Sequence, residues 1–310
     1  MRTTLLRTAD TAGGTSRIAN DGRFALDLVV RPAMPADMPA AGRIACEAFH
    51  AIASRHGFPP DFPSSEAAIA LLSGLCARDD VHAIVAERGG HVVGSNFLWE
   101  GDPVAGVGPI SVDVSVQDDG TGRALMQAVL ERARERRATG VRLVQAAYHN
   151  RSLALYAKLG FVPREPLSLL QGPVPEVART DRIARVATAN DIGACNGVAL
   201  RVLGQPRTSE LRHAIAAGDA RVVEHKGRIT GYTTGVGFLG HAIGEANDDV
   251  QALIGASTQI AGPGFLLPTR NAALLRWCLA HGLRIVQPMT LMSIGAYRDP
   301  AGAYLPSILY

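Results

Sequence analysis

The segment Gln117-Asp118-Asp119-Gly120-Thr121-Gly122 lies between two stretches of different hydrophobic period. Residues 110–116 are apolar at every second position, which is typical of a β-strand, whereas the apolar residues from Leu125 onward share one helical face. Glycines let a ligand approach the backbone closely, and the N–H groups of a first helical turn have no acceptor within the helix. With the positive end of the helix dipole, these donors favour a bound phosphate. The sequence therefore predicts a phosphate-bearing cofactor at this loop.

The spacing of the glycines separates three kinds of phosphate-binding loop. A Walker loop would need Lys-Ser or Lys-Thr at the start of the helix, and neither occurs there. A dinucleotide fingerprint would need a third glycine, which the run after Gly122 lacks. What remains is the pattern Gln-x-x-Gly-x-Gly between a strand and a helix.

A second motif follows the first after a predicted strand at residues 141–147. Residues 150–161 are Asn-Arg-Ser-Leu-Ala-Leu-Tyr-Ala-Lys-Leu-Gly-Phe. Asn150 or Ser152 can cap this helix, Gly160 can end it in a left-handed conformation, and Phe161 can begin the next strand. Together the two motifs resemble the acetyl-CoA loop and the Asn-initiated helix of the GNAT superfamily of N-acetyltransferases.

The resemblance implies an enzyme that moves an acetyl group from acetyl-CoA to a primary amine by direct attack, without a metal. In such enzymes the strand before the loop splays from its neighbour and binds the pantetheine arm, and the loop amides bind the pyrophosphate. The Val112 N–H is then the donor to the oxyanion. Carried over to this sequence, the cofactor-binding residues are Ile110, Ser111, Val112, Gln117, Asp118, Asp119, Gly120, Thr121, Gly122, Arg123, Asn150 and Ser152.

Tyr156 occupies the position of the family's general acid, which protonates the departing thiolate. Its alternative role is that of a core aromatic, because it lies at helical spacing from other apolar residues. Three carboxylates near the predicted site, Glu100, Asp113 and Glu245, are each more typical of solvated or hydrogen-bonded acids. We therefore assign no general base.

The loop departs from the family pattern in its charge. Asp118 and Asp119 are acidic where the family usually has basic residues. A carboxylate some ~7 Å from a phosphate opposes binding by about 0.6 kcal/mol at the dielectric constant of water. Arg123 and Arg151 are the expected compensating charges, so we expect weakened rather than abolished binding.

The second half of the chain repeats features of the first. Residues 30–33 and Asp37 correspond to residues 184–187 and Asp191, and the hairpin residues 91–94 correspond to 228–231. We expect an α/β protein of two GNAT-like domains, each a mixed central β-sheet flanked by helices. The predicted divisions are a flexible tail (1–24), an acetyl-CoA-binding domain (25–171), a linker (172–180) and a degenerate domain (181–310).

The second copy is predicted to be inactive. It has no Gln-x-x-Gly-x-Gly, and aligning Asn271 with Asn150 places Trp277 opposite Tyr156. The decoy Gly235-Val236-Gly237-Phe238-Leu239-Gly240 matches a dinucleotide pattern, but no helix is predicted directly after it. An oxidoreductase that binds NAD is therefore the weaker alternative. A non-catalytic CoA-binding or sensing module is the stronger one.

The composition and net charge argue against several classes of protein. A net charge of +3 without a basic run argues against nucleic acid, and no apolar run is long enough for a membrane span. Four isolated cysteines and the absence of a secretory core at the start favour a cytoplasmic protein, and the histidines have no metal-binding spacing. The acceptor is expected to be a small-molecule or peptide amine, with residues 58–63 forming a rigid, partly apolar rim of its pocket.

Overall fold

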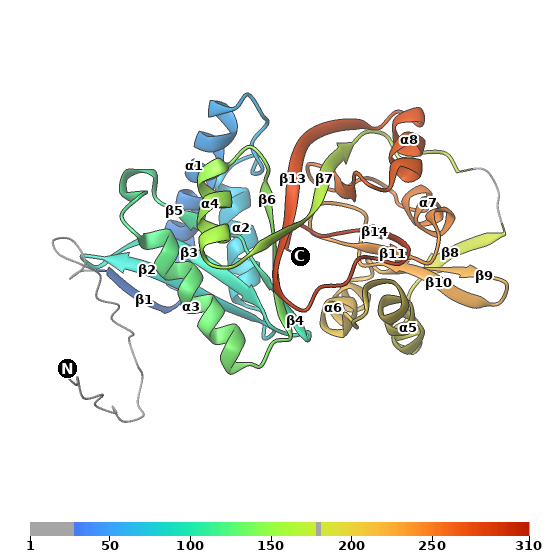
Figure 1. Cartoon of the computed structure of the whole chain (residues 1–310), viewed down its shortest axis with the longest axis horizontal. Coiled ribbons are helices and arrows are strands. Elements are labelled where there is room, and N and C mark those ends of the chain that lie inside the picture. Colours follow the sequence, from blue (N-terminus) through green and yellow to red (C-terminus); the bar gives the residue numbers. More distant parts are fainter. Residues whose placement is uncertain (1–27, 178–180, 310) are drawn as a thin grey trace.

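The computed structural model describes residues 28–177, here called the first half, and residues 181–309, called the second half. The predicted tail at residues 1–24 and the end of the predicted linker lie outside the described residues. Figure 1 shows the halves side by side, each a β-sheet flanked by helices. Within the described ranges, no helix combines the length and the apolar composition that crossing a membrane requires.

The elements of the two halves follow one another in a similar order. The first half contains β1 (Leu28–Pro32), α1 (Met38–Arg55), α2 (Ser65–Cys76), β2 (Val81–Arg88), β3 (His91–Trp99), β4 (Val104–Val107), β5 (Ser111–Val112), α3 (Thr121–Glu135), β6 (Gly140–Ala146), α4 (Asn150–Lys158) and β7 (Val162–Gln171). The second half contains β8 (Arg182–Val186), α5 (Ile192–Leu203), α6 (Thr208–Ala217), β9 (Arg221–His225), β10 (Arg228–Thr233), β11 (Ala242–Gly244), α7 (Asn247–Gly255), β12 (Phe265–Pro268), α8 (Ala272–Ala280), β13 (Arg284–Gly295) and β14 (Ala303–Leu305).

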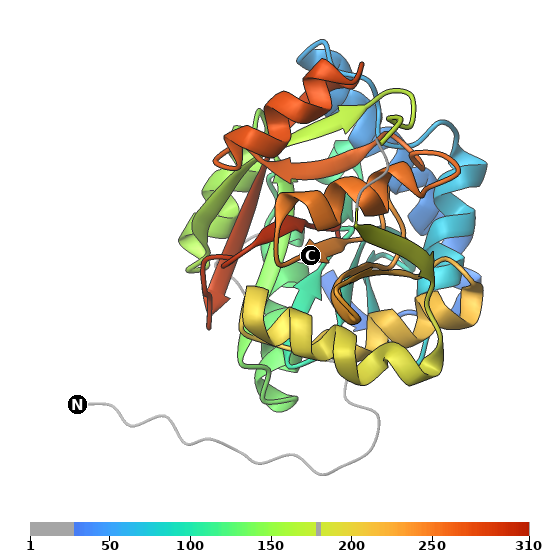
Figure 2. The ribbon, with the colours of Figure 1, turned by 90° about the vertical axis from the view of Figure 1, so that its right-hand side faces the viewer.

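The helices cover both faces of the sheets. In the first half, apolar residues of α1 and α2 pack on one face and those of α3 and α4 on the other. Figure 2 views the molecule from the second half, with α5 and α6 (yellow) on one side of the second sheet and α7 (orange) on the other. The polar face of α3 is exposed, which is the expected amphipathic arrangement, whereas Ser209 of α6 bonds to Asp80 and Asp102 of the first half.

Strands from both halves form one nine-stranded sheet in the order β1-β2-β3-β4-β6-β13-β7-β12, with β5 paired to β3. β13 lies between β6 and β7 and runs antiparallel to both, and β12 pairs with the other edge of β7. Strands of the two halves therefore alternate across the centre of the molecule, as Figure 1 shows. This one sheet therefore contains strands that precede the predicted linker in the sequence and strands that follow it.

Two local structures recur in both halves. Arg31 pairs with Asp37 at 2.7 Å, and Arg185 pairs with Asp191 at 2.8 Å, so the same ion pair closes the turn before α1 and before α5. Each arginine also donates to a glutamate on the neighbouring strand of its sheet. The correspondence predicted between these two segments is confirmed in their contacts.

The predicted hairpins also correspond. A Cβ at Gly94 of β3 would lie 2.7 Å from the carbonyl oxygen of Ser111, and one at Gly231 of β10 would lie 2.8 Å from that of Ile243. In each half the next strand crosses this position too closely for any side chain. Glycine is therefore required at both positions for the same steric reason.

The strand predicted at residues 110–116 is wrong in its extent. Only Ser111 and Val112 pair with β3, and residues 114–116 form a 3-10 turn. The Asp113 carboxylate accepts the Ser115 N–H at 2.8 Å and so stabilises the turn that ends the strand. The alternation of apolar residues does not show that the Asp113 side chain forms a turn here in place of further strand pairing.

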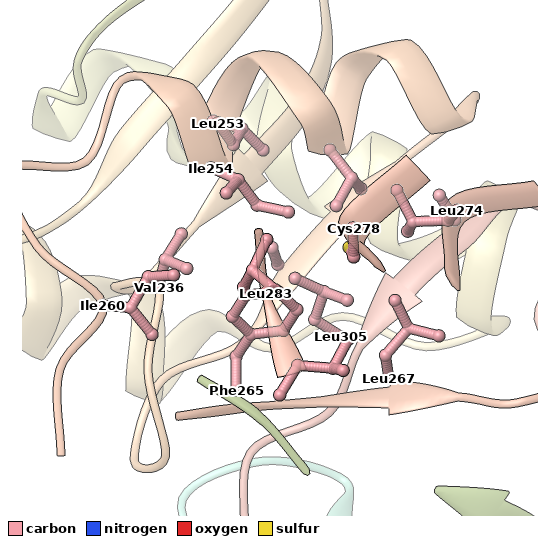
Figure 3. Close-up of a cluster of buried hydrophobic side chains, with 14 of the residues drawn as sticks. Val236, Leu253, Ile254, Ile260, Phe265, Leu267, Leu274, Cys278, Leu283 and Leu305 are labelled. Atoms are coloured by element: carbon pink, nitrogen blue, oxygen red, sulfur yellow. The ribbon is translucent and has the colours of Figure 1, made fainter. Parts of the chain in front are cut away.

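The second half differs from the first at its third and fourth strands. β14 pairs antiparallel with β11 and extends the second sheet, whose order is β14-β11-β10-β9-β8. Leu305 of β14 packs beside Phe265, Leu267 and Leu283 in the core that Figure 3 shows. The space between β11 and β12 is thus filled by the chain's own last strand.

The shared sheet makes the halves dependent on one another. We expect residues 1–177, expressed alone, to aggregate or to lack cooperative unfolding, because without β13 both β6 and β7 expose unpaired backbone groups. Coexpression with residues 178–310 should restore soluble protein with a single thermal transition. A monomeric, cooperatively unfolding fragment of residues 1–177 would contradict this prediction.

Candidate functional site

A cleft opens where the first half's sheet separates. β4 pairs in parallel with β6 over the three residue pairs from Val104–Gly140 to Gly106–Arg142, after which the chain follows β3 and leaves β6. The opening leads into a cavity of about 1,360 Å³ whose walls come from both halves. Such a volume exceeds that of a typical small-ligand site and has room for a long cosubstrate together with an acceptor.

The predicted phosphate loop lies at the rim of this cavity. Gly120 precedes α3 with φ of +85°, and Asp118 also has a positive φ of +76°. Because Gly120 has no side chain, it cannot cap the helix, and the first N–H groups of α3 are left for an external acceptor. A Cβ at Gly122 would make only ordinary contacts, 3.6 Å from Leu155 and 3.7 Å from Val112.

Each acidic residue of the loop is paired with an arginine. Arg151 donates to Asp118 at 3.0 Å and to the Gln117 side chain, and Arg88 donates to Asp119 at 3.1 Å. Arg151 was expected to compensate the loop's negative charge, whereas Arg88, 31 residues before Asp119, was missed. These pairs reduce the repulsion that the carboxylates would exert on a phosphate.

Most of the predicted cofactor-binding residues line the cavity, and three do not. The Asp119 side chain is turned toward Arg88, Asn150 is exposed at the start of α4, and Thr121 is 1% exposed with a hydroxyl that has no partner within the described ranges. The predicted cofactor-binding residues that line it are Ile110, Ser111, Val112, Gln117, Asp118, Gly120, Gly122, Arg123 and Ser152, and the predicted acid Tyr156 lines it as well.

The cap of α4 is His149, not Asn150 or Ser152 as predicted. Its Nδ1 accepts the Ser152 N–H at 3.2 Å. Burial, with the nearby Arg151, lowers the pKa of His149 to about 4, so the ring is neutral at pH 7 and Nδ1 is free to accept. Histidine seldom takes this role, and sequence preferences for Asn and Ser therefore place the cap one or more residues too late.

Because the N-cap of α4 is His149 and not Asn150, the alignment of α4 with α8 of the second half moves by one residue. Asn271 caps α8 as His149 caps α4, and both helices end at a left-handed glycine, Gly160 and Gly282. The Phe161 N–H bonds to Tyr156 O, and the Leu283 N–H bonds to Cys278 O. The counterpart of Tyr156 is thus the buried Cys278, and the predicted pairing with Trp277 is wrong by one residue.

Tyr156 lies between the core and the cavity. It is 6% exposed, and its ring packs edge-on to Phe161 at 6.0 Å between centroids. Burial raises the pKa of Tyr156 to about 12, against the opposing hydrogen bond with the Ser152 side chain. The phenol is therefore protonated at neutral pH and can donate a proton into the cavity.

None of the three carboxylates considered as bases lines the cavity. Glu100 is bonded by Arg132 at 2.7 Å, and Glu245 is bonded by two arginines of the second half. Asp113 caps the turn after β5. All three are occupied by structural contacts, which agrees with leaving the base unassigned.

Gln145 on β6 is a residue that the sequence did not indicate. It lines the cavity, is 6% exposed, and neither atom of its side-chain amide has a hydrogen-bond partner in the described part of the chain. Two residues along the strand from Leu143, it lies on the face that packs against Tyr156. An unpaired buried amide at this position is suited to an external hydrogen-bonding ligand.

Two other patterns have structural explanations. The glycine-rich residues 235–240 connect β10 to β11, so a strand and not a helix follows them directly, and they offer no helix N-terminus for a pyrophosphate. Asp79, Asp80 and His213 have potential ligand atoms within 4.8 Å of one another, a proximity that spacing did not predict. Asp80 is already bonded to Ser209 at 2.7 Å, so this cluster joins the first half to α6.

Comparison with known proteins gives a family match for part of the chain. Residues 47–161 match the model described as the acetyltransferase (GNAT) family. This stretch begins in α1, ends just before β7, and contains the loop, α3, β6 and α4. Among curated proteins, none matches the sequence.

Solved structures share the fold over most of the chain. A Pyrococcus horikoshii protein assigned as an acetyltransferase has a TM-score of 0.71 at 16% identity, covering 93% of this chain and 98% of its own. A GCN5-related N-acetyltransferase from Sphaerobacter thermophilus has a TM-score of 0.56 at 18% identity, covering 89% and 98%. A glucosamine N-acetyltransferase region of a fungal multi-domain GH3 β-N-acetylglucosaminidase has a TM-score of 0.56 at 14% identity, covering 88% of this chain and 39% of that one. The expected α/β fold of two GNAT-like domains flanked by helices is confirmed. The expectation that each domain has a mixed sheet is wrong for the second half, because all pairs of the five-stranded sheet are antiparallel, whereas the nine-stranded sheet is mixed.

The unpaired Gln145 gives a prediction about stability. We expect Gln145→Leu to raise the free energy of unfolding of the ligand-free protein by about 1–3 kcal/mol, because it removes a buried amide without partners at similar volume. The matched control is Gln287→Leu, which removes an amide hydrogen-bonded to Asp61 and Tyr148 and should lower that free energy. Urea unfolding measures both, and equal losses of stability would refute the assignment.

Proposed function

We propose that the chain transfers an acetyl group from acetyl-CoA to a primary amine, and that the first half carries out the reaction. The observation that carries this proposal is the uncapped start of α3 beside the splayed β5 and β6. Together they offer phosphate donors and, within the same cavity, a slot for an extended thioester arm. The family match over residues 47–161 supports the same assignment.

The oxyanion donor is the Val112 N–H. Alternate residues of an antiparallel strand bond to the same neighbour, and the Asp113 N–H already bonds to Val93 O on β3 at 2.9 Å. The Val112 N–H therefore points to the opposite edge, toward the gap beside β6. Its carbonyl on that edge accepts the Gln117 side chain at 3.1 Å, which holds the loop against the strand.

In the reaction, the lone pair of the neutral amine attacks the thioester carbonyl carbon, and the Val112 N–H stabilises the oxyanion. The C–S bond then breaks as the carbonyl reforms, and the Tyr156 hydroxyl donates its proton to the departing thiolate. The amine nitrogen loses one proton, and Tyr156 regains one from solvent. The products are the acetylated amine and CoA.

The second half is proposed to bind no cofactor. β14 fills the gap between β11 and β12, and its Leu305 belongs to the core. In the first turn of α7 the Asp249 carboxylate accepts the Ala246 N–H at 2.9 Å, and Asp248 and Asp249 both pair with Arg182, so acidic side chains already occupy this helix terminus. The second half instead contributes Phe238, Met289 and Ile308 to the cavity walls.

Two substitutions at Gly122 separate the steric effect of a side chain in the loop from the effect of a negative charge there. We expect Gly122→Ala to bind acetyl-CoA nearly as well as the wild type, because the new methyl makes ordinary contacts. Gly122→Asp should fold, since a carboxylate suits the start of a helix, but should raise the dissociation constant at least about tenfold through repulsion of the diphosphate. Calorimetry compares them, and equal affinities would count against phosphate binding at α3.

Tyr156→Phe tests the acid. We expect kcat to fall about 100-fold with little change in KM, because only the proton donor is lost. In the wild type the rate should rise with pH as the amine is deprotonated, without a loss from Tyr156 below its pKa of about 12. The control Tyr297→Phe removes a hydroxyl 3.3 Å from Glu165, away from the cavity lining, and should leave kcat unchanged.

Equal release of CoA by wild type and Tyr156→Phe would remove Tyr156 from the mechanism. Binding of acetyl-CoA without turnover of any amine would instead favour the alternative function, a non-catalytic CoA-binding or sensing module.

A further inference from the structure

A polar contact between the two halves lies at residues 58–63, the predicted rim of the acceptor pocket. Gln287 of β13 is 2% exposed and donates to Asp61 Oδ1 at 3.2 Å. The Tyr148 hydroxyl donates to Gln287 Oε1 at 3.3 Å, and its ring stacks on Phe58 at 4.3 Å. Asp61 and Tyr148 both line the cavity.

Asp61 is a carboxylate whose charge has no cationic partner in the described ranges. Burial raises its pKa, and the hydrogen bond from Gln287 acts in the opposite direction. A neutral amide supplies one hydrogen bond but does not balance the charge. Buried carboxylates are otherwise paired with cations, and here the open side of the group is the cavity.

Apolar side chains lie near this carboxylate and line other parts of the cavity. Phe49 packs edge-on to Phe62, the residue after Asp61, and Met289 Sδ lies 3.6 Å from Gln287 Nε2. The first half contributes Phe49, Ile52 and Leu71 from α1 and α2. From the second half come Phe238 and Met289. A ligand that fills this part of the cavity therefore needs an apolar body and one positive charge.

We propose that Asp61 binds the ammonium group of the acceptor, and that the acceptor is a primary amine on an apolar skeleton rather than an amino sugar or a polyamine. This inference rests on the proposed function of the same cavity. Gln287 holds the carboxylate in place, so the acceptor site is complete only when β13 is present. The proton that the ammonium must lose before attack passes to the carboxylate and returns to solvent after transfer.

The test uses 2-phenylethylamine, glucosamine and spermidine as acceptors. We expect the wild type to acetylate 2-phenylethylamine with the highest kcat/KM, and Asp61→Asn to lower that value about 10- to 100-fold with the affinity for acetyl-CoA unchanged. The control Glu66→Gln alters an exposed carboxylate on α2 outside the cavity lining and should change neither quantity. A preference for glucosamine or spermidine, or full activity of Asp61→Asn, would overturn the proposal.

A binding measurement separates this inference from the proposed function. Benzyltrimethylammonium, which cannot be acetylated, should bind the wild type and lose about 10- to 100-fold in affinity in Asp61→Asn, whereas neutral 2-phenylethanol should bind both proteins alike. Equal losses for the two ligands would show general damage to the pocket and overturn the role of Asp61. If acetyl-CoA fails to bind while the cation result holds, the acetyl transfer fails and the cation site stands.

Discussion

The pairing of β13 with β6 is the constraint on which the rest of the structure depends. β6 is hydrogen-bonded along seven residue pairs to β13, from Met289–Ala146 to Gly295–Gly140, but to β4 over only three. The first half therefore keeps a rigid wall on one side of the cleft while the other side follows β3 away from it. The same strand carries Gln287, which bonds to the cavity-lining Asp61, so the element that fixes the fold also supports the proposed acceptor site.

The two halves have a similar order of elements but differ at the gap between their central strands. In the first half the gap between the central strands is open, and the helix beyond it begins without a cap. In the second half β14 closes the corresponding gap, and acidic residues occupy the first turn of α7. Burial of Leu305 adds apolar packing to the core of the second half and so stabilises it.

Local features were predictable from sequence because their causes lie within a few residues. The glycine turn at Gly120 lies at the start of α3, α4 begins at Asn150, and Gly160 ends that helix with a positive φ. The paired arginines Arg31 and Arg185 were also visible, since each lies six residues before its aspartate. Features that depend on residues far apart in the sequence were not predictable. These are the insertion of β13 between β6 and β7, the Arg88–Asp119 ion pair, and the lack of a hydrogen-bond partner at the Gln145 amide. The one-residue error at Trp277 arose because the N-cap of α4 is His149, a residue type that seldom takes this role.

The proposed function requires that the first half alone binds one molecule of acetyl-CoA. Calorimetric titration of the full chain with acetyl-CoA, followed by a crystal structure of the complex, tests this most directly. We expect one molecule per chain, with its diphosphate on the N–H groups at the start of α3 and its thioester between β5 and β6. No binding, or a second molecule bound between β11 and β12, would contradict the account.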